Sequence, residues 1–560
     1  MKVTGASIII KKLLEEGVEY IFGYPGGSVI PLFDELYNFT DRIKLIQPRH
    51  EQGGTHAADG YARSTGKTGV VVVTSGPGAT NTVTGIATAY MDSVPLVIIT
   101  GQVPVSMMGS DAFQEVDTTA ITLPITKANF LIKDIKELTP ALDLAFHIAK
   151  SGRPGPVLID IPSDIQKALI DERKIVKGDI KNYSPRHDID DEKINKVYNM
   201  LSESKKPLII SGGGIIISEA TEILKRFMEK NNIPVITTLM GKGIYPSREE
   251  LYFDGLGMHG TYYGNYAVQN SDLILALGVR FSDRILGNVE KFAPFAKIVH
   301  VDIDRSEIEK NVQPIIGIEG DVKEVLEKFL SFPELKTDFS DWIKELNQQK
   351  KEFPLSYEKG KKLKPQYLIE LANKYFPEDT IVVSDVGQNQ MWTAQFYKFT
   401  KPRTFLTTGG LGTMGFGLPA SMGAKVGNPD KQVLVISGDG GFQMNIQELI
   451  TIKRYALNVK ILIVDNAYLG MVKQWQELFY NKRYSATPFT DNPDFRAIAE
   501  VIGIKSKTLK DWDKAEEIIK ELALSKEPML IHALIDPDEN VFPMVPAGAS
   551  LNEILLNKEG

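Results

Sequence analysis

Val433–Gly440 reads VLVISGDG, and the next apolar run, Val459–Asn466, reads VKILIVDN. Each run is short, rich in β-branched residues and of the length of a buried strand, and a helix-length stretch separates them. Two buried strands joined by a helix form a parallel β-α-β unit. These residues therefore predict a parallel sheet covered by helices.

The same arrangement occurs in the first third of the chain. Val70–Gly78 reads VVVVTSGPG and is followed by a helix-length stretch and the apolar run Val94–Gly101. In both copies the strand ends in Ser-Gly-x-Gly, where glycine permits a sharp turn and the close approach of a ligand. We favour an internal repeat over the alternative that strand–turn–helix units simply look alike.

Strand-like and helical runs alternate along nearly all of the 560 residues, a length too great for one hydrophobic core. Two polar, charge-rich segments interrupt the alternation and read as linkers, the second with helical periodicity in its middle. We expect an α/β protein of three Rossmann-like, doubly wound domains with mainly parallel sheets. The expected limits are 1–166, 190–332 and 365–545 for the domains, 167–189 and 333–364 for the linkers, and 546–560 for a tail.

The composition, with 43% hydrophobic and 24% charged residues, is that of a globular protein. The net charge is 64 − 71 = −7, and neither a basic block nor a membrane-length apolar run is present, so no nucleic-acid or membrane partner is expected. The absence of cysteine excludes disulfides, thiolate nucleophiles and zinc–thiolate sites. Met1–Glu16 reads as an amphipathic helix opened by Thr4 and not as a targeting peptide, so we expect a cytoplasmic protein.

Asp439 and Asn466 stand at the carboxyl ends of two neighbouring predicted strands, where parallel sheets bind their ligands. Carboxylate and amide oxygens, completed by phosphate oxygens and water, suit Mg²⁺. Gly440 and Gly441 would let backbone amides approach a phosphate at a helix start. The alternative is an Asp-Gly turn with a capping Asn. We interpret the motif as a site for a magnesium-bound diphosphate.

Glu51 follows the strand-like run Leu45–Gln47 and precedes a helical stretch. Thiamine chemistry needs a carboxyl group that shares a proton with a ring nitrogen of the aminopyrimidine, and burial would raise the pKa of that group. The alternative is a glutamate that simply favours a helix N-terminus. The residues alone leave both interpretations open.

Two glycine-rich stretches match the dinucleotide pattern GxGxxG literally. One contains Gly410, Gly412 and Gly415, and the other is 255–260, which reads GLGMHG. We expect neither to follow a strand of a β-α-β unit as a dinucleotide fingerprint requires, so we interpret neither as one.

Together these residues resemble the catalytic large subunit of acetohydroxyacid synthase, also called acetolactate synthase. The resemblance covers nearly the whole chain, from GYPGG at 23–27 to VPAGA at 545–549. Stretches more specific than the general thiamine-enzyme pattern are GSDAFQE at 109–115, GMHG at 257–260, RFSDR at 280–284 and GMVKQW at 470–475.

The resemblance implies three cofactors: thiamine diphosphate, Mg²⁺ and FAD. It makes the first domain pyrimidine-binding, the central domain FAD-binding and the third domain diphosphate-binding. Glu51 would activate the pyrimidine, Asp439, Asn466 and the backbone oxygen of Tyr468 would bind the metal, and Met414 would wedge the cofactor into a bent shape. Further contacts with the thiamine cofactor are implied for Gln388, Gly412, Gly438, Gly440, Gly441 and Met471.

The flavin contacts implied by the resemblance lie mostly in the central domain. The matching residues are Arg153, Gly212, Gly213, Gly214, His259, Gly260, Gly278, Arg280, Asp302, Asp304 and Asp321. In this family the flavin has no net redox part in the main reaction. The alternative is a Rossmann-like domain without its nucleotide, because related decarboxylases keep the fold without the flavin.

The implied reaction decarboxylates pyruvate and ligates the hydroxyethyl unit to a second 2-keto acid, in the biosynthesis of the branched-chain amino acids valine and isoleucine. Pyruvate as acceptor gives 2-acetolactate, and 2-oxobutyrate gives 2-aceto-2-hydroxybutyrate. Arg284 would bind the acceptor carboxylate and Trp475 the longer acceptor, whereas Gly27, Phe113 and Gln114 would complete the catalytic pocket, the last two from a partner subunit. The rival functions are a flavin-dependent pyruvate oxidase and another thiamine-dependent 2-keto acid decarboxylase.

The family builds each site across a dimer interface, so a homodimer or tetramer is expected, with a separate regulatory small subunit.

Two residues depart from the family pattern. Ser163 stands where members often have Lys, which puts a contact at the substrate channel in doubt. Asp465 stands where the first Asn of a usual Asn-Asn pair is found, and this leaves the ligand Asn466 intact.

Overall fold

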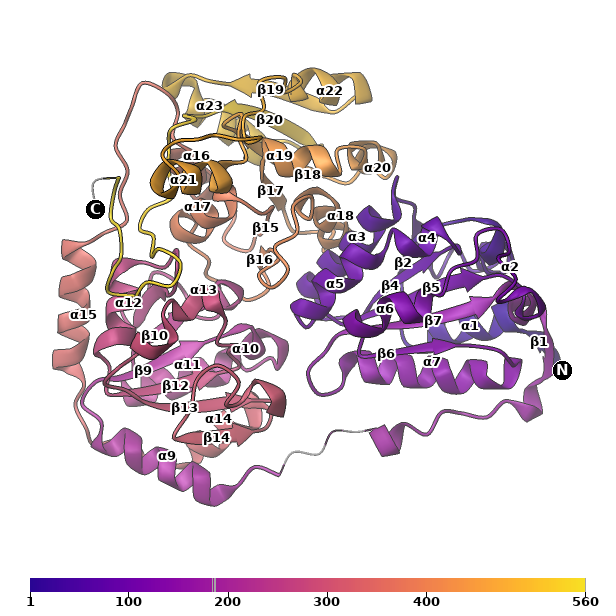
Figure 1. Cartoon of the computed structure of the whole chain (residues 1–560), viewed down its shortest axis with the longest axis horizontal. Coiled ribbons are helices and arrows are strands. Elements are labelled where there is room, and N and C mark those ends of the chain that lie inside the picture. Colours follow the sequence, from indigo (N-terminus) through magenta and orange to yellow (C-terminus); the bar gives the residue numbers. More distant parts are fainter. Residues whose placement is uncertain (184, 186–187, 559–560) are drawn as a thin grey trace.

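The structure is a computed structural model that describes all residues except 184, 186–187 and 559–560 (Figure 1), so parts of the predicted linker 167–189 and of the tail lie outside it. Three separate six-stranded sheets, all of them parallel, form the framework. The predicted α/β class with doubly wound parallel sheets is confirmed.

The first sheet has the strand order β3-β2-β4-β5-β7-β6. Its strands are β2 (Tyr20–Tyr24), β3 (Lys44–Ile46), β4 (Gly69–Val73), β5 (Leu96–Gln102), β6 (Ala128–Leu131) and β7 (Pro156–Pro162). The helices of this part are α1 (Gly5–Glu15), α2 (Ile30–Tyr37), α3 (Glu51–Thr65), α4 (Pro77–Thr80), α5 (Val83–Met91), α6 (Thr118–Thr122), α7 (Ile135–Lys150) and α8 (Ser163–Lys167).

The sheet near the C-terminus has the order β16-β15-β17-β18-β20-β19. Its strands are β15 (Ile381–Ser384), β16 (Phe405–Leu406), β17 (Val433–Gly438), β18 (Val459–Asp465), β19 (Lys505–Leu509) and β20 (Met529–Leu534). Its helices are α16 (Pro365–Tyr375), α17 (Gln388–Phe396), α18 (Gly417–Gly427), α19 (Asp439–Met444), α20 (Glu448–Arg454), α21 (Gly470–Phe479), α22 (Phe495–Ile502) and α23 (Trp512–Leu524). Numbered along the chain, the strands of both sheets run second, first, third, fourth, sixth, fifth, which confirms the predicted internal repeat.

The central sheet differs, with the order β11-β10-β9-β12-β13-β14. This is the order of dinucleotide-binding folds, in which ligands bind where the connections change direction, here between β9 and β12. Its strands are β9 (Pro207–Ser211), β10 (Val235–Thr237), β11 (Tyr252–Gly255), β12 (Leu273–Leu277), β13 (Lys297–Asp302) and β14 (Ile316–Glu319). Its helices are α9 (Asp191–Glu203), α10 (Gly213–Ile217), α11 (Thr221–Asn231), α12 (Tyr262–Asn270), α13 (Asp283–Leu286), α14 (Val322–Ser331) and α15 (Ser340–Glu352).

Two sequence predictions need correction. Thr4 opens the N-terminal helix as its N-cap, as predicted, but residues 1–4 are not helical, because β1 (Lys2–Thr4) pairs with β8 (Leu169–Asp171) and this pairing buries Val3 and Ile170. The glycine pattern at 255–260 does follow a strand and precede a helix, since it starts at the end of β11 and α12 comes next. However, β11 is an edge strand, and the position that binds a dinucleotide in this order follows β9.

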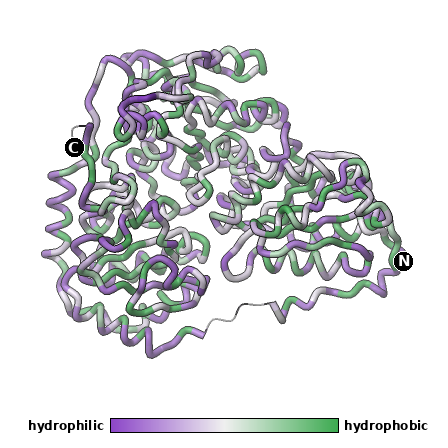
Figure 2. The backbone as a smooth tube through the Cα atoms, in the orientation of Figure 1, coloured by the Kyte–Doolittle hydropathy of each residue, from purple (hydrophilic) through white to green (hydrophobic). Residues whose placement is uncertain are grey.

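The apolar residues lie mainly on the strands and on the helix faces packed against them, as the green segments in Figure 2 show. The first and third sheets are joined through α3 and α18, which lie side by side in Figure 1. A Cβ atom at Gly60 would collide with the backbone of Ala420, and one at Gly423 with that of Ala57, so glycine is needed where the two helices cross. In the part of the chain that the structure describes, no helix combines the length and the apolar character needed to cross a membrane.

Candidate active site

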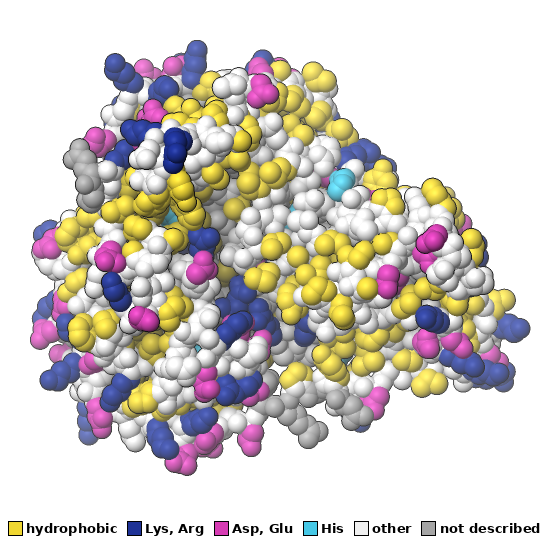
Figure 3. Space-filling model, in the orientation of Figure 1, with side chains coloured by type: hydrophobic (Ala, Val, Ile, Leu, Met, Phe, Trp, Pro, Cys, Tyr) yellow, Lys and Arg dark blue, Asp and Glu magenta, His cyan; other side chains and the backbone are white. Residues whose placement is uncertain are grey.

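A cavity of about 930 Å³ lies between the central and C-terminal sheets and reaches the edge of the first. Figure 3 shows Lys and Arg side chains gathered where the first domain meets the central one. Most predicted site residues line this cavity: Arg153, Gly213, Gly214, His259, Gly260, Gly278, Arg280, Arg284, Asp302, Asp321, Gln388, Gly412, Met414, Gly438, Asp439, Gly440, Gly441, Asn466, Tyr468, Met471 and Trp475. Gly212 and Asp304 lie directly behind it, beside Gly278 and Arg153.

The predicted metal ligands come together at the carboxyl ends of β17 and β18. Asp439 is the first residue of α19 and is buried, and Asn466 follows β18. Asn466 accepts the backbone N–H of Tyr468 at 3.1 Å and donates to Gln388 at 3.0 Å. Burial and the nearby carboxylate of Asp465 raise the pKa of Asp439, and a bound cation would reverse that effect.

The donor set at this point fits Mg²⁺. One carboxylate, one amide oxygen and a backbone carbonyl are hard oxygen ligands, and phosphate oxygens and water can complete six. Among the residues that the structure describes, no group of three or more His, Cys, Asp or Glu side chains could hold a metal. The set is therefore suited to a cation that arrives with a phosphate rather than to one held by protein side chains alone.

Glycines line the same end of the cavity. A Cβ atom at Gly440 would lie 2.8 Å from the ring of Phe489, and one at Gly441 would collide with the carboxylate of Asp385. Glycine is thus needed at both positions for packing, and both line the cavity at the start of α19, where backbone N–H groups can meet a phosphate. These residues fit a diphosphate bound through the cation.

Met414 lies between two glycines with left-handed backbone, Gly412 (φ 71°) and Gly415 (φ 87°). Its terminal carbon approaches Gly440, where a Cβ atom would be 3.4 Å away. The buried carboxylate of Asp385 accepts the backbone N–H of Gly415 at 3.0 Å and of Gly417 at 2.8 Å. Burial raises the pKa of Asp385 to about 6. Asp385 thus fixes the segment that presents Met414 to the metal end of the cavity.

The turn after β9 forms the other end of the cavity. A Cβ atom at Gly214 would lie 2.7 Å from the Cα of Gly278, so these two segments pack backbone against backbone. Nearby, Arg153 is paired with Asp304 at 3.0 Å and Glu307 at 2.8 Å. This is the switch between β9 and β12, where the fold binds nucleotides.

Three further side chains at this end fit an anionic nucleotide. Arg280 is 30% exposed and its closest ion-pair partner is Asp92 at 3.8 Å, so its charge is only loosely compensated. The Nε2 atom of His259 is buried and makes no hydrogen bond, which is costly unless a ligand supplies one. Burial raises the pKa of Asp302 to about 6. The residues present therefore fit the diphosphate and sugar of a flavin nucleotide.

Arg284 and Trp475 reach the cavity from α13 and α21. The Arg284 side chain is 56% exposed, contacts the sulfur of Met258 at 3.3 Å and has its nearest carboxylate, Asp283, at 3.6 Å. Because no buried ion pair occupies it, the guanidinium can bind the carboxylate of a small substrate. An indole and a guanidinium that line one cavity suit a short 2-keto acid.

The remaining predicted residues lie elsewhere, on the first domain. Glu51 begins α3, is half-buried and accepts the side-chain N–H of Asn81 at 2.9 Å. Gly27 is exposed at the end of the loop after β2, and Phe113 is 87% exposed. Gln114 packs on the loop after β4, since a Cβ atom at Gly76 would be 2.9 Å from that of Gln114. None of these four lines the cavity, so one chain does not unite the two halves of the predicted site.

The structure adds residues that the sequence did not indicate. Asn492, in the loop before α22, donates to Asp439 at 2.7 Å and to Asp465 at 3.1 Å. Asp465, the residue that departs from the family pattern, is also paired with His532 at 2.8 Å. No motif or periodicity marks Asn492, because its role depends on the fold of a loop.

Glu448 is a second such residue, fully buried on α20. Its carboxylate accepts the backbone N–H of Arg49 at 2.9 Å and of His50 at 3.2 Å, immediately before Glu51. The C-terminal domain thus fixes the start of the helix that carries Glu51.

Ser163 stands where the family often has a lysine at the substrate channel. It begins α8 and does not line the cavity.

Comparisons with known proteins match these three parts. Family models match residues 3–121 as "Thiamine pyrophosphate enzyme, N-terminal TPP binding domain", 194–329 as the central domain, and 385–533 as the C-terminal TPP binding domain. The chain is 46% identical over 553 residues to "Acetolactate synthase large subunit" of Lactococcus lactis, which covers 99% of this chain and 96% of the relative. It is 48% identical over 564 residues to "Probable acetolactate synthase large subunit" of Methanocaldococcus jannaschii, which covers 98% of this chain and 95% of the relative. It is 45% identical over 571 residues to "Acetolactate synthase, chloroplastic" of Arabidopsis thaliana, which covers 99% of this chain and 85% of the relative.

Proposed function

The chain belongs to the thiamine pyrophosphate enzymes and, among them, to the acetolactate synthase large subunits, and we propose from this premise that it makes 2-acetolactate from two molecules of pyruvate. With 2-oxobutyrate as acceptor, the product is 2-aceto-2-hydroxybutyrate. Both products serve the biosynthesis of branched-chain amino acids. We keep 1–166, 190–332 and 365–545 as the proposed domain limits.

One observation carries this proposal: a single cavity contains both the predicted metal ligands and a pair of groups suited to a 2-keto acid. Asp439, Asn466, Arg284 and Trp475 all line it. Arg284 can bind the carboxylate of an acceptor keto acid, and the indole of Trp475 can contact its alkyl group, which favours a reaction with a second keto acid.

When bound, thiamine diphosphate supplies a nucleophilic carbon that holds the electron pair left by departing CO₂. Asp439, Asn466 and the carbonyl of Tyr468 would hold Mg²⁺, which would bind the diphosphate. Met414, which lies beside Gly440, would support the cofactor at this end of the cavity. Arg284 would orient the acceptor through its carboxylate, and Trp475 would contact its alkyl group and exclude water.

We propose that the acid Glu51 reaches this site from a second copy of the chain, in a homodimer. Glu51 does not line the cavity of its own chain, and the large apolar side chain of Phe113 on the same domain is 87% exposed. A symmetric dimer would let each copy supply Glu51, Phe113 and Gln114 to the other. A regulatory small subunit that binds this assembly is also part of the proposal, because the relative from Lactococcus lactis is named a large subunit.

FAD is the proposed ligand at the central end of the cavity. The glycine turn after β9, the loosely compensated Arg280 and the unpartnered Nε2 of His259 support it. We propose that its role is structural, because acetolactate formation needs no net electron transfer.

The experiment that tests the function is incubation of the purified protein with pyruvate, thiamine diphosphate, Mg²⁺ and FAD in an oxygen electrode. We expect acetolactate and CO₂ without oxygen uptake. Acetate or acetyl phosphate with peroxide would instead identify a flavin-dependent pyruvate oxidase. Acetaldehyde as the main product would identify a decarboxylase, and either result would refute the proposal.

A further inference from the structure

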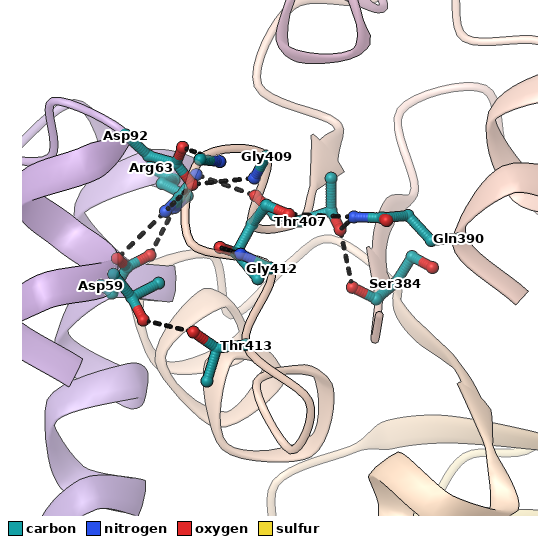
Figure 4. Close-up of polar contacts among 12 residues, drawn as sticks. Asp59, Arg63, Asp92, Ser384, Gln390, Thr407, Gly409, Gly412 and Thr413 are labelled. Carbon is teal, nitrogen blue, oxygen red and sulfur yellow. Dashed lines mark hydrogen bonds and ion pairs between the residues drawn. The ribbon is translucent and has the colours of Figure 1, made fainter. Parts of the chain in front are cut away.

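The segment that carries Gly412 and Met414, residues 407–416, is hydrogen-bonded within its own domain and also, at several points, to another domain of the same chain. We call this segment the glycine loop. Figure 4 shows Asp59, Arg63 and Asp92 of the first domain facing it. The loop belongs to the C-terminal part, between β16 and α18.

Asp92 directly follows α5 and its carboxylate is fully buried. One oxygen accepts the backbone N–H of Gly410 at 2.8 Å, and the other accepts that of Gly409 at 3.0 Å. One side chain thus binds two successive amides at the start of the loop. Such hydrogen bonds to a charged acceptor are among the strongest that a protein makes.

Arg63, on α3, completes the contact with the loop. It pairs with Asp92 at 3.0 Å and with Asp59, and it donates to the carbonyl of Thr407 at 2.9 Å. Its guanidinium also lies 5.3 Å from the centre of the Phe416 ring. Arg63 therefore contacts the first and the last residue of the glycine loop, and a planar, rigid guanidinium holds both in a fixed relation.

The middle of the loop has its own bond to the first domain, between the hydroxyl groups of Thr88 and Thr413 at 2.7 Å. Arg280 of the central domain approaches Asp92 at 3.8 Å. Asp92 therefore joins the first domain to residues of the other two.

Buried ion pairs make this arrangement rigid. Two buried carboxylates, Asp59 and Asp92, share the one guanidinium of Arg63, so removal of Arg63 would leave both carboxylates in the interior without that partner. A loop bound to such a cluster has little freedom to shift. The stiffness matters because a displacement of about 1 Å can slow a reaction about a hundredfold.

We propose that Asp92 and Arg63 are positioning residues of the thiamine site, which fix the glycine loop so that Met414 holds the cofactor in its reactive shape. Both residues border the cavity, and their polar atoms bond to the loop and to each other. The proposal rests on the proposed function only in requiring that the cavity binds thiamine diphosphate, and not on which product is made.

Hydrogen–deuterium exchange at C2 of bound thiamine diphosphate tests this, because the exchange needs no substrate and depends on the shape of the cofactor. In Asp92→Asn, the amide nitrogen cannot accept a backbone N–H, and the charge that pairs with Arg63 is lost. We expect exchange at saturating cofactor to fall about tenfold to a hundredfold and kcat to fall with it. The Kd for thiamine diphosphate should stay within about threefold, because the metal and diphosphate contacts are intact.

Asp134→Asn is the matched control, since Asp134 caps α7 at the surface, far from the loop, and Asn is an equally good cap. Thr88→Val, which deletes one hydroxyl, should slow exchange in the same direction by a smaller factor, and it serves if Asp92→Asn does not fold. Exchange at the wild-type rate in every folded variant would overturn the proposal, as would a rate loss that added cofactor fully restores. A wild-type protein that exchanges the C2 proton but forms no acetolactate would refute the proposed function and leave this proposal standing.

Discussion

Asn492 provides a sharp test of the metal site, because it touches a predicted ligand without being one. Its side-chain N–H₂ donates to Asp439 at 2.7 Å and to Asp465 at 3.1 Å, and its oxygen accepts from Gln443 at 2.9 Å. Asn492 thus occupies one oxygen of Asp439 and separates two like charges. We expect Asn492→Ala to weaken Mg²⁺ binding.

The magnitude follows from the contact that is lost. A hydrogen bond to a charged group contributes about 1.5–3 kcal/mol, and about 1.4 kcal/mol corresponds to a factor of ten in binding. Without the shared donor, repulsion from Asp465 would also favour protonation of Asp439, and Mg²⁺ must displace that proton. We therefore expect the Kd for Mg²⁺ to rise about tenfold to a hundredfold, the range typical of groups that orient metal ligands.

The assay is a Mg²⁺ titration at saturating thiamine diphosphate. Binding is measured by isothermal calorimetry and by tryptophan fluorescence, to which Trp475 in the cavity contributes. Asn195→Ala is the control, because Asn195 is exposed on α9 and bonds only to the backbone of its own helix. A Kd for Asn492→Ala within twofold of the wild type (about the error of such a titration) would refute the placement of the metal at Asp439.

Three further predictions concern the acid, the acceptor and stability. Glu51→Gln should lower acetolactate formation by about a hundredfold or more while thiamine diphosphate still binds, which activity and binding assays with the same preparation would measure; full activity would exclude the assigned role. Trp475→Leu should reduce the preference for 2-oxobutyrate over pyruvate about tenfold or more in a competition experiment, because a methylene contact contributes about 1–3 kcal/mol; an unchanged product ratio would place the acceptor elsewhere. Burial raises the pKa of Asp160 from 3.8 to about 7, so the folded protein binds this proton more tightly than the unfolded chain does. The free energy of unfolding should therefore fall as the pH rises between these two pKa values, by up to about 4 kcal/mol. Urea unfolding at pH 5 and pH 8 should show a smaller loss for Asp160→Asn than for the wild type, and equal losses would contradict the prediction.

The sequence predicted the parts of the site that depend on local pattern. Buried runs that end in glycine predicted β4 and β17, and the polar residues after β17 and β18 do lie together. This worked because parallel strands place their carboxyl ends at one edge whatever the rest of the fold. The shared strand order of the first and third sheets followed from the same repeated pattern.

The sequence could not predict contacts that depend on how domains pack. Asp92 and Arg63 stand in a helix-rich stretch without a motif, and they meet the glycine loop only because α3 and α18 cross closely. Glu448 is likewise an ordinary helical residue until the fold places it beside the start of α3. The β1–β8 pair was missed because three-residue strands give too little periodicity to recognise.

The central claim is that the active site combines Glu51 of one copy with Asp439 of another. Glu51→Gln and Asp439→Asn should each inactivate the homodimer. A mixed dimer, purified through two different tags, would contain one site with both changes and one with none. We predict that it regains about half of the wild-type activity per dimer, since one of its two sites is intact. A mixed dimer as inactive as its parents would contradict the account.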